Sequence, residues 1–307
     1  AAGAATPGDD ESVGALVRRR LGDEVLDRLV APLVGSIYAG DCDRLSLQVS
    51  AAQLAAARDH DPRDPSLVRA AAALRAEAVD SGRPVFLAPA GGMGRVVEAL
   101  AAALGDDLRA GAPVAAIAPA GSAWRIEPAG VAADAVVVAT PAFAAGPLLA
   151  PLAPDAAGFL TGIDHASVAL VALAVPRDGI ERQLDGSGFL VPRSAGLLLT
   201  ACSWVTTKWP HLDVDPSIAL LRASVGHDRD VRVLTLSDEE LVAGVLADLR
   251  TTMCLRAEPA EVRISRWPRS FPQPRPGHLA ALAAAEAAVA RVSPRLAITG
   301  AWARGVG

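Results

Sequence analysis

The hydrophobic pattern of this chain changes its period partway along the sequence. Between Ser12 and Val34 the apolar residues recur every three or four positions, as they do on one face of a helix. From His165 to Val225 they form short runs separated by Gly, Pro and Asp, which is typical of strands joined by turns. We therefore expect a mixed α/β protein, with helices in the first 83 residues and a mixed or antiparallel sheet in the second half.

Capping residues and glycines give the approximate bounds of the elements. A turn is expected at Gly35–Asp41, and Gly22 is expected to break the first helix. The run Ala135–Ala139 is continuously apolar, as in a strand buried on both faces. Further helices are predicted at 46–58, 66–79, 95–104, 237–250 and 279–292, and strands at 85–88, 113–117, 123–127, 135–139, 166–175, 186–192, 196–205, 217–225, 261–267 and 295–299.

Composition excludes several classes of protein. The 307 residues are 51% hydrophobic and 21% charged, so the chain can bury a core and is not intrinsically disordered. A net charge of −5 gives no basic face for nucleic acid. The three cysteines are far apart, which predicts reduced thiols rather than a disulfide framework or a zinc ribbon. The apolar runs are about half the roughly 20 residues of a membrane-spanning helix, and the acidic first residues do not resemble a signal peptide, so a cytoplasmic protein is predicted.

The chain shows few groups that carry chemistry by themselves. Gly186-Ser187-Gly188 is not a G-x-S-x-G nucleophile elbow, and no histidine spacing suggests a metal site. His165 and His211 are interpreted as surface residues, and we identify no catalytic residue. The turn Gly91-Gly92-Met93-Gly94 leads into a helix but is not a dinucleotide fingerprint. Scarcity of acid and base groups suits a redox flavoenzyme, in which the cofactor carries the reaction.

Five segments in order resemble the oxygen-dependent protoporphyrinogen/coproporphyrinogen oxidases, which are members of the FAD-linked amine-oxidase superfamily. The first, Arg19–Ser46 with its GSIYAGD turn, is the most specific of them. The other four are LAPAGGMGR at 87–95, AVVVATP at 135–141, GSGFLVPR at 186–193 with Lys208-Trp209-Pro210 and Leu221-Arg222, and Arg266-Trp267 through Gly277-His278 with 300–307. Ser36 and Pro274 depart from the usual family pattern.

The resemblance implies a cofactor and a set of residues around it. FAD would be bound by backbone and apolar groups, with Trp267 beside the ring. The implied FAD residues are Gly91, Gly92, Met93, Val114, Thr140, Pro141, Trp267, Gly300, Gly305, Val306 and Gly307. The implied substrate residues are Gly188 and Leu190, which would line an apolar slot, and Arg193 and Lys208, which would bind propionates. No metal is expected.

The resemblance also implies an activity and a division of the chain. The activity is oxidation of coproporphyrinogen III or protoporphyrinogen IX by oxygen, for haem biosynthesis; the alternatives are a monoamine-oxidase-like enzyme and a non-catalytic tetrapyrrole-binding fragment. The expected parts are a helical module at 1–83, pieces of a partial Rossmann-like FAD domain at 84–150 and 261–307, and a substrate sheet at 151–260. The family's N-terminal fingerprint and C-terminal helix are not in the sequence, so we expect a fragment. Peripheral membrane contact and oligomeric state stay open.

Overall fold

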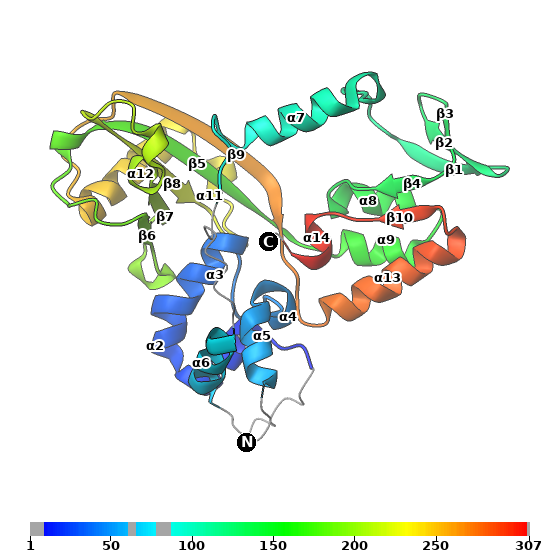
Figure 1. Cartoon of the computed structure of the whole chain (residues 1–307), viewed down its shortest axis with the longest axis horizontal. Coiled ribbons are helices and arrows are strands. Elements are labelled where there is room, and N and C mark those ends of the chain that lie inside the picture. Colours follow the sequence, from blue (N-terminus) through cyan, green and yellow to red (C-terminus); the bar gives the residue numbers. More distant parts are fainter. Residues whose placement is uncertain (1–8, 61–65, 78–86, 306–307) are drawn as a thin grey trace.

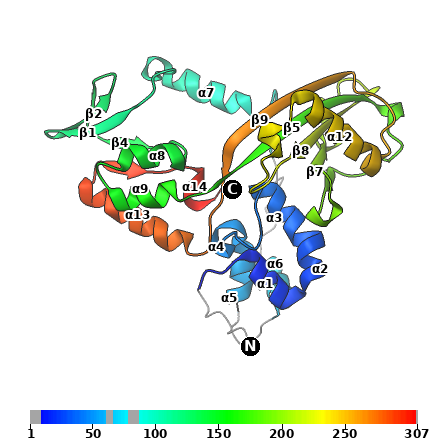
Figure 2. The same ribbon diagram turned by 180° about the vertical axis from the view of Figure 1, so that it is seen from behind.

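The structure is a computed structural model that describes residues 9–60, 66–77 and 87–305. Helices between residues 13 and 77 form one module, drawn in blue at the bottom of Figure 1. A five-stranded sheet lies above it on one side, and a smaller layer of helices and strands lies on the other. Figure 2 shows the same three parts from behind.

The helical module begins with α1 (Val13–Leu21), whose N-terminus is capped by Ser12. The Ser12 hydroxyl accepts a hydrogen bond from the Ala15 amide at 3.1 Å, and the helix ends at Gly22, where φ is +91°. After Gly22 the chain is helical again, and these turns pack through one apolar core. The further helices are α2 (Asp23–Val25), a π-helical turn (Leu26–Val30), α3 (Ala31–Tyr38), α4 (Leu47–Ser50), α5 (Ala52–Asp59) and α6 (Leu67–Glu77).

The predicted turn at Gly35–Asp41 is wrong in its first half. Helix α3 continues to Tyr38, which is buried, and only then does the chain turn at Ala39, with φ +49°. The Ser36 hydroxyl donates to the Leu33 carbonyl at 2.8 Å, so a turn-forming side chain is satisfied within the helix. Burial of Tyr38 in the module core outweighs the local turn signal of Gly35 and Ser36.

The large sheet is antiparallel and has the strand order β6-β7-β8-β5-β9. Its strands are β5 (His165–Pro176), β6 (Gly188–Leu190), β7 (Leu199–Trp204), β8 (Ile218–Val225) and β9 (Glu261–Pro272). Helix α12 (Asp238–Met253) packs Leu241, Val245 and Leu249 against the sheet core. The capping box predicted from Ser237 and Glu240 is confirmed, with both hydrogen bonds present. Short helices α10 (Val205–Lys208) and α11 (Arg232–Thr235) lie beside the strands.

The smaller layer is built around two parallel strands. Strand β4 (Val136–Val138) pairs with β10 (Leu296–Ile298), and helices α8 (Ala142–Leu149), α9 (Pro154–Thr161) and α13 (His278–Val292) bury their apolar sides in one cluster with them. Val137 is 63% exposed, so the prediction that this run is buried on both faces is wrong: the helices of the cluster leave that side uncovered. A separate antiparallel sheet contains β1 (Ala116–Ala120), β2 (Ala123–Glu127) and β3 (Val131–Ala133), and α14 (Ala301–Arg304) follows β10.

Helix α7 (Gly94–Leu104) has no buried residue. Its apolar side chains are exposed, and both views show α7 apart from the cores of the smaller layer and the large sheet. The strand predicted at 85–88 lies partly outside the described residues, and 87–88 are not in a strand.

Two differences from the expected division of the chain concern the boundaries. Strand β9, expected in the C-terminal FAD piece, pairs with β5 and belongs to the large sheet. Helix α9, expected in the substrate sheet, packs in the core around β4 and β10. Within the described residues, no helix is long and apolar enough to cross a membrane.

Candidate functional site

The two parallel strands β4 and β10 end at a cavity of about 370 Å³. Thr140 and Pro141 follow β4, Gly300 follows β10, and all three line this cavity. Ligands of open α/β sheets bind outside the carboxyl ends of the strands, because the loops that leave the sheet there surround a crevice. The cavity at the ends of β4 and β10 is therefore the first candidate site.

Gly300 and Trp302 fix the wall of this cavity. The Trp302 indole Nε1 donates to the Thr140 carbonyl at 3.0 Å, so it joins the segments that follow the two strands. Gly300 has φ +153°, and a Cβ at this position would overlap the Trp302 indole. A larger residue at position 300 would thus displace Trp302, which is buried in the core of the small layer.

The third wall of the cavity comes from β9. Pro268, Arg269 and Ser270 line it, and they follow Trp267, whose side chain is 52% exposed. The structure therefore brings Thr140, Pro141 and Gly300 together, with Trp267 one residue from the wall.

The other residues implied for FAD lie elsewhere or outside the described part. Gly91 and Gly92 have positive φ angles, and Met93 is 64% exposed; none of the three lines the cavity. Val114 is 44% exposed and does not line it either. Gly305 lies at the helical module, because a Cβ there would contact the Tyr38 hydroxyl at 3.0 Å. Val306 and Gly307 are outside the described residues.

A second cavity of about 300 Å³ lies between the helical module and the large sheet. Arg193 lines it, donating from Nη2 to the Gly40 carbonyl at 3.0 Å and lying 3.7 Å from the Asp41 carboxylate. Cys42 also lines it, and burial, with the nearby Asp41 and Asp43, raises the pKa of its thiol to about 12. Arg193 is still half-exposed, so its guanidinium can take a second anionic partner.

The other predicted substrate residues do not line this second cavity. Gly188 and Leu190 lie on β6, the short edge strand, and Leu190 is 38% exposed. Lys208 ends α10, with its ammonium 5.9 Å from the centre of the Trp209 ring. The four predicted residues thus lie on or just after β6 and β7, and of the four only Arg193 lines the second cavity.

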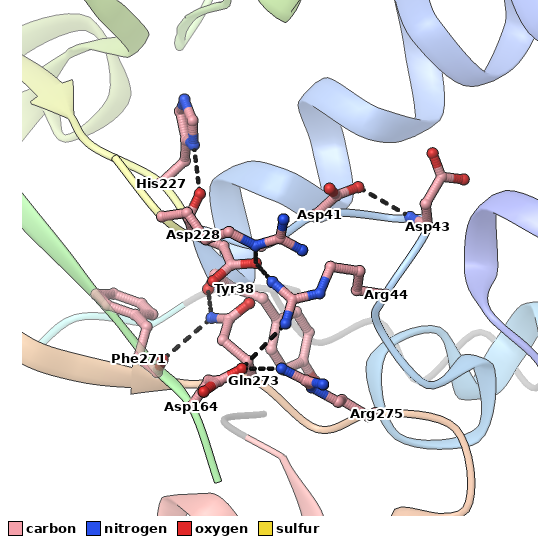
Figure 3. Close-up of polar contacts among 12 residues, drawn as sticks. Tyr38, Asp41, Asp43, Arg44, Asp164, His227, Asp228, Phe271, Gln273 and Arg275 are labelled. Atoms are coloured by element: carbon pink, nitrogen blue, oxygen red, sulfur yellow. Dashed lines mark hydrogen bonds and ion pairs between the residues drawn. The ribbon is translucent and has the colours of Figure 1, made fainter. Parts of the chain in front are cut away.

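Ion pairs join Arg44, which follows the GSIYAGD segment, to one end of the large sheet, where β8 ends and the antiparallel β5 begins (Figure 3). The Arg44 guanidinium lies between Asp228, at 2.5 Å, and Asp164, at 3.0 Å, and Arg275 also pairs with Asp164. Burial raises the pKa of the Asp164 carboxyl, but Arg275 and then Arg44 outweigh burial and hold that pKa below its ordinary value.

Two main-chain contacts complete the junction. The Asp228 amide donates to the Ala39 carbonyl at 2.6 Å, and the buried Gln273 side chain donates to the Tyr38 carbonyl at 2.7 Å. The turn that carries Gly40 is thereby fixed against the sheet, and this sets the position of the Arg193 partner.

Several residues that line the first cavity were not predicted from the sequence, among them Phe143, His165 and Arg269. His165, interpreted as a surface residue, is half-buried beside the Phe143 ring, with ring centroids 5.1 Å apart. These residues come from three segments that are distant in sequence, so no local pattern predicts that they meet. The available sequence signal was that Phe143 lies near the predicted Thr140-Pro141 and Arg269 near the predicted Trp267.

Comparison with known proteins defines the class. The chain belongs to the family of flavin containing amine oxidoreductases, whose model matches residues 2–306. It is 34% identical to the coproporphyrinogen III oxidase of Bacillus subtilis (strain 168), over 97% of this chain and 64% of that protein. It is 31% identical to the coproporphyrinogen III oxidase of Staphylococcus aureus (strain NCTC 8325 / PS 47), over 97% of this chain and 66% of that one.

A solved structure supports the same assignment. A crystal structure from Exiguobacterium sp. 255-15, which carries the provisional name protoporphyrinogen oxidase, has a TM-score of 0.80 and 28% identity, over 100% of this chain and 65% of that one. The predicted resemblance and the mixed α/β fold are confirmed. The chain spans 64–66% of the length of the first two relatives, just under two thirds.

The first cavity fits the ring end of a flavin. Its volume of about 370 Å³ is within the range of small-ligand sites, and it lies at the carboxyl ends of parallel strands. Gly300 keeps the wall free of a side chain, and Phe143 and Pro141 offer apolar contacts to a flat ring. FAD, predicted from the sequence, is the cofactor expected for a flavin-containing family.

Proposed function

We propose that the protein oxidises a porphyrinogen to the porphyrin, with FAD as cofactor and oxygen as the final acceptor, and that coproporphyrinogen III is the substrate to test first. The observation that carries the proposal is the 34% identity with the Bacillus subtilis coproporphyrinogen III oxidase over 97% of this chain. The rice protein named protoporphyrinogen oxidase is 28% identical, so protoporphyrinogen IX is the second substrate to test.

The reaction needs few acid and base groups from the protein. Converting a porphyrinogen to a porphyrin removes six hydrogens, which three molecules of oxygen take up as three molecules of hydrogen peroxide. A bound flavin supplies the hydride acceptor. What the chain must supply is orientation and an environment for an electron-rich, apolar macrocycle.

In this proposal the predicted site residues have the following roles. Thr140, Pro141 and Gly300 hold the flavin at the ends of β4 and β10, and Trp267 lies beside the ring. Arg193, oriented by the Gly40 carbonyl, binds a propionate at the junction of the helical module and the sheet. Gly188 and Leu190 contact the macrocycle, and Lys208 binds a propionate at the edge of the sheet. Gly91, Gly92, Met93, Val114, Gly305, Val306 and Gly307 stay assigned to FAD by the resemblance alone.

The test is a stoichiometric oxidation assay. The purified protein is reconstituted with FAD and mixed with freshly reduced coproporphyrinogen III, while porphyrin fluorescence and oxygen uptake are recorded together. We expect three molecules of oxygen consumed per porphyrin formed, above the rate with heat-denatured protein. Protoporphyrinogen IX in a parallel assay decides between the two substrates.

The alternatives give different results in the same assay. A monoamine-oxidase-like enzyme would consume oxygen with amines and leave both porphyrinogens unchanged. The likeness to cyclohexylamine oxidase and putrescine oxidase, at 16% and 20% identity, concerns the fold alone. A tetrapyrrole-binding protein would be colourless after FAD treatment, and its tryptophan fluorescence would be quenched by porphyrin. Either result would refute the proposal.

We also infer that, if the protein contacts a membrane surface, the helical module makes the contact. Leu29, Leu33 and Ile37 are spaced by four residues and are 64%, 52% and 49% exposed. Co-sedimentation with phospholipid vesicles tests this inference. Binding that persists in the variant Leu29→Ser/Leu33→Ser would contradict it.

A further inference from the structure

Strand β9 contains a bulge at the wall of the first cavity. Ala166 pairs with Phe271 and Val168 pairs with Trp267, so the three residues Pro268–Ser270 of β9 stand opposite Ser167 alone. The Ser167 hydroxyl accepts a hydrogen bond from the Arg269 amide at 2.9 Å. Bulges redirect side chains, and this bulge turns residues 268–270 to line the cavity.

Arg269 occupies a conformation that side chains rarely adopt. Its φ is +49°, in the left-handed region, which costs a residue other than glycine on the order of 1 kcal/mol. Such strain persists only where the surrounding structure holds the residue in place. Here the bulge, the Ser167 hydroxyl and an aromatic ring do so, because the Arg269 guanidinium carbon lies 3.7 Å from the centre of the Phe143 ring.

Arg269 is also the fixed positive charge at this cavity. No ion pair joins it to a carboxylate of residues 9–60, 66–77 or 87–305, although most arginines of the described chain have one. The other basic group of the cavity is His165, and burial lowers its pKa, which favours the neutral imidazole. A stacked arginine without an acidic partner points to an anionic or electron-accepting ligand.

We propose that Arg269 is a positioning residue for the flavin, whose fixed charge faces the ring in this cavity and raises the reduction potential of the bound cofactor. This inference rests on the proposed function, because it requires FAD in the first cavity. The physical reason is that a positive charge favours the addition of electrons to a nearby ring, and more so in a cavity with little water. Contact with the Phe143 ring holds the guanidinium in place.

The experiment measures the midpoint potential of FAD bound to the purified protein, by equilibration with a reference dye. In Arg269→Met we expect the potential to fall by at least the equivalent of a tenfold change in the reduction equilibrium, about 30 mV for a two-electron couple. Arg269→Lys keeps the charge and should stay near the wild-type value. Phe143→Leu frees the guanidinium and should give an intermediate fall, which keeps the test usable if Arg269→Met does not fold.

Arg263→Met is the matched control. It lies on the same strand, its side chain is 80% exposed, and it pairs with Glu261. A wild-type potential in Arg269→Met, or an equal fall in Arg269→Lys or in Arg263→Met, would overturn the inference while leaving the proposed function intact. A wild-type protein that binds no FAD would overturn both.

Discussion

Replacing Arg44 with methionine should destabilise the contact between the helical module and the large sheet. Methionine keeps the aliphatic stem and removes only the guanidinium, which lies between Asp228 and Asp164. The Asp228 side chain is 7% exposed, so its carboxylate would lose its closest cation in a poorly solvated place. Breaking a buried ion pair from one side costs about 3–5 kcal/mol.

Two neighbours reduce that figure. Arg229 lies 3.7 Å from the Asp228 carboxylate and compensates part of its charge. Asp164 is 46% exposed and keeps Arg275, so its loss is at most about 1 kcal/mol. We therefore expect a loss of about 2–4 kcal/mol, which at about 2 °C per kcal/mol lowers Tm by roughly 4–8 °C.

Calorimetry of the purified variants is the assay for Arg44→Met. Asp228→Asn alone and the double variant complete a cycle, and residues in direct contact should show a coupling energy of about 0.5–3 kcal/mol. Arg263→Met, an exposed pair, should change stability by less than about 0.5 kcal/mol. If Arg44→Met unfolds at the wild-type temperature, the junction is not stabilised by this ion pair and the reasoning fails.

Three further predictions concern reactivity, pH and backbone conformation. The exposed Cys254 should react with iodoacetamide at least ~100-fold faster than the buried Cys42, because burial and nearby carboxylates raise the pKa of the Cys42 thiol to about 12. Equal labelling of the two cysteines, measured by peptide mass spectrometry, would contradict this difference in reactivity. The folded-state pKa of Asp164 is below its ordinary value of 3.8, so the ionised carboxylate stabilises the folded protein above about pH 5, and this contribution is lost as the pH falls through the folded pKa. The Tm difference between wild type and Asp164→Asn should therefore shrink from pH 5 toward pH 2. A constant difference would refute the assignment. Gly188→Ala should lower the free energy of unfolding in urea by at least about 2 kcal/mol, because φ is +137° and the added Cβ would overlap the backbone of β7. The control Gly158→Ala in α9 places its Cβ in open space and should be neutral or stabilising. Equal stabilities of the two variants would contradict the clash.

The sequence predicted elements where local signals agree with the tertiary structure. The capping box at Ser237 and the apolar runs of β5 and β8 are such cases, because the side chains that mark them are those that the fold uses. Helices α8 and α9 were missed. Both are rich in Ala and Gly, α8 is apolar on all sides and contains Pro147, so neither shows a period.

The candidate site was predictable only in part, for a similar reason. Thr140-Pro141 and Gly300 follow strands, and a strand followed by a turn can be found locally. The bulge that presents Arg269 depends on the register between β5 and β9, which are 100 residues apart in sequence, and no local pattern determines such a register. The contact of Arg269 with Phe143 depends in addition on where α8 packs in the smaller layer.

Helix α7 has a consequence for how the chain behaves in water. Met93, Val97, Leu100 and Leu104 follow one another at three- and four-residue steps, and each is more than half exposed. Eleven residues without a packed face are too few to stay helical by themselves, so the amide hydrogens of α7 would exchange with solvent among the fastest of any helix here. The same exposed apolar stripe would adsorb to chromatography resin, to detergent micelles or to other copies of the chain. Covering this stripe would therefore reduce aggregation in concentrated samples.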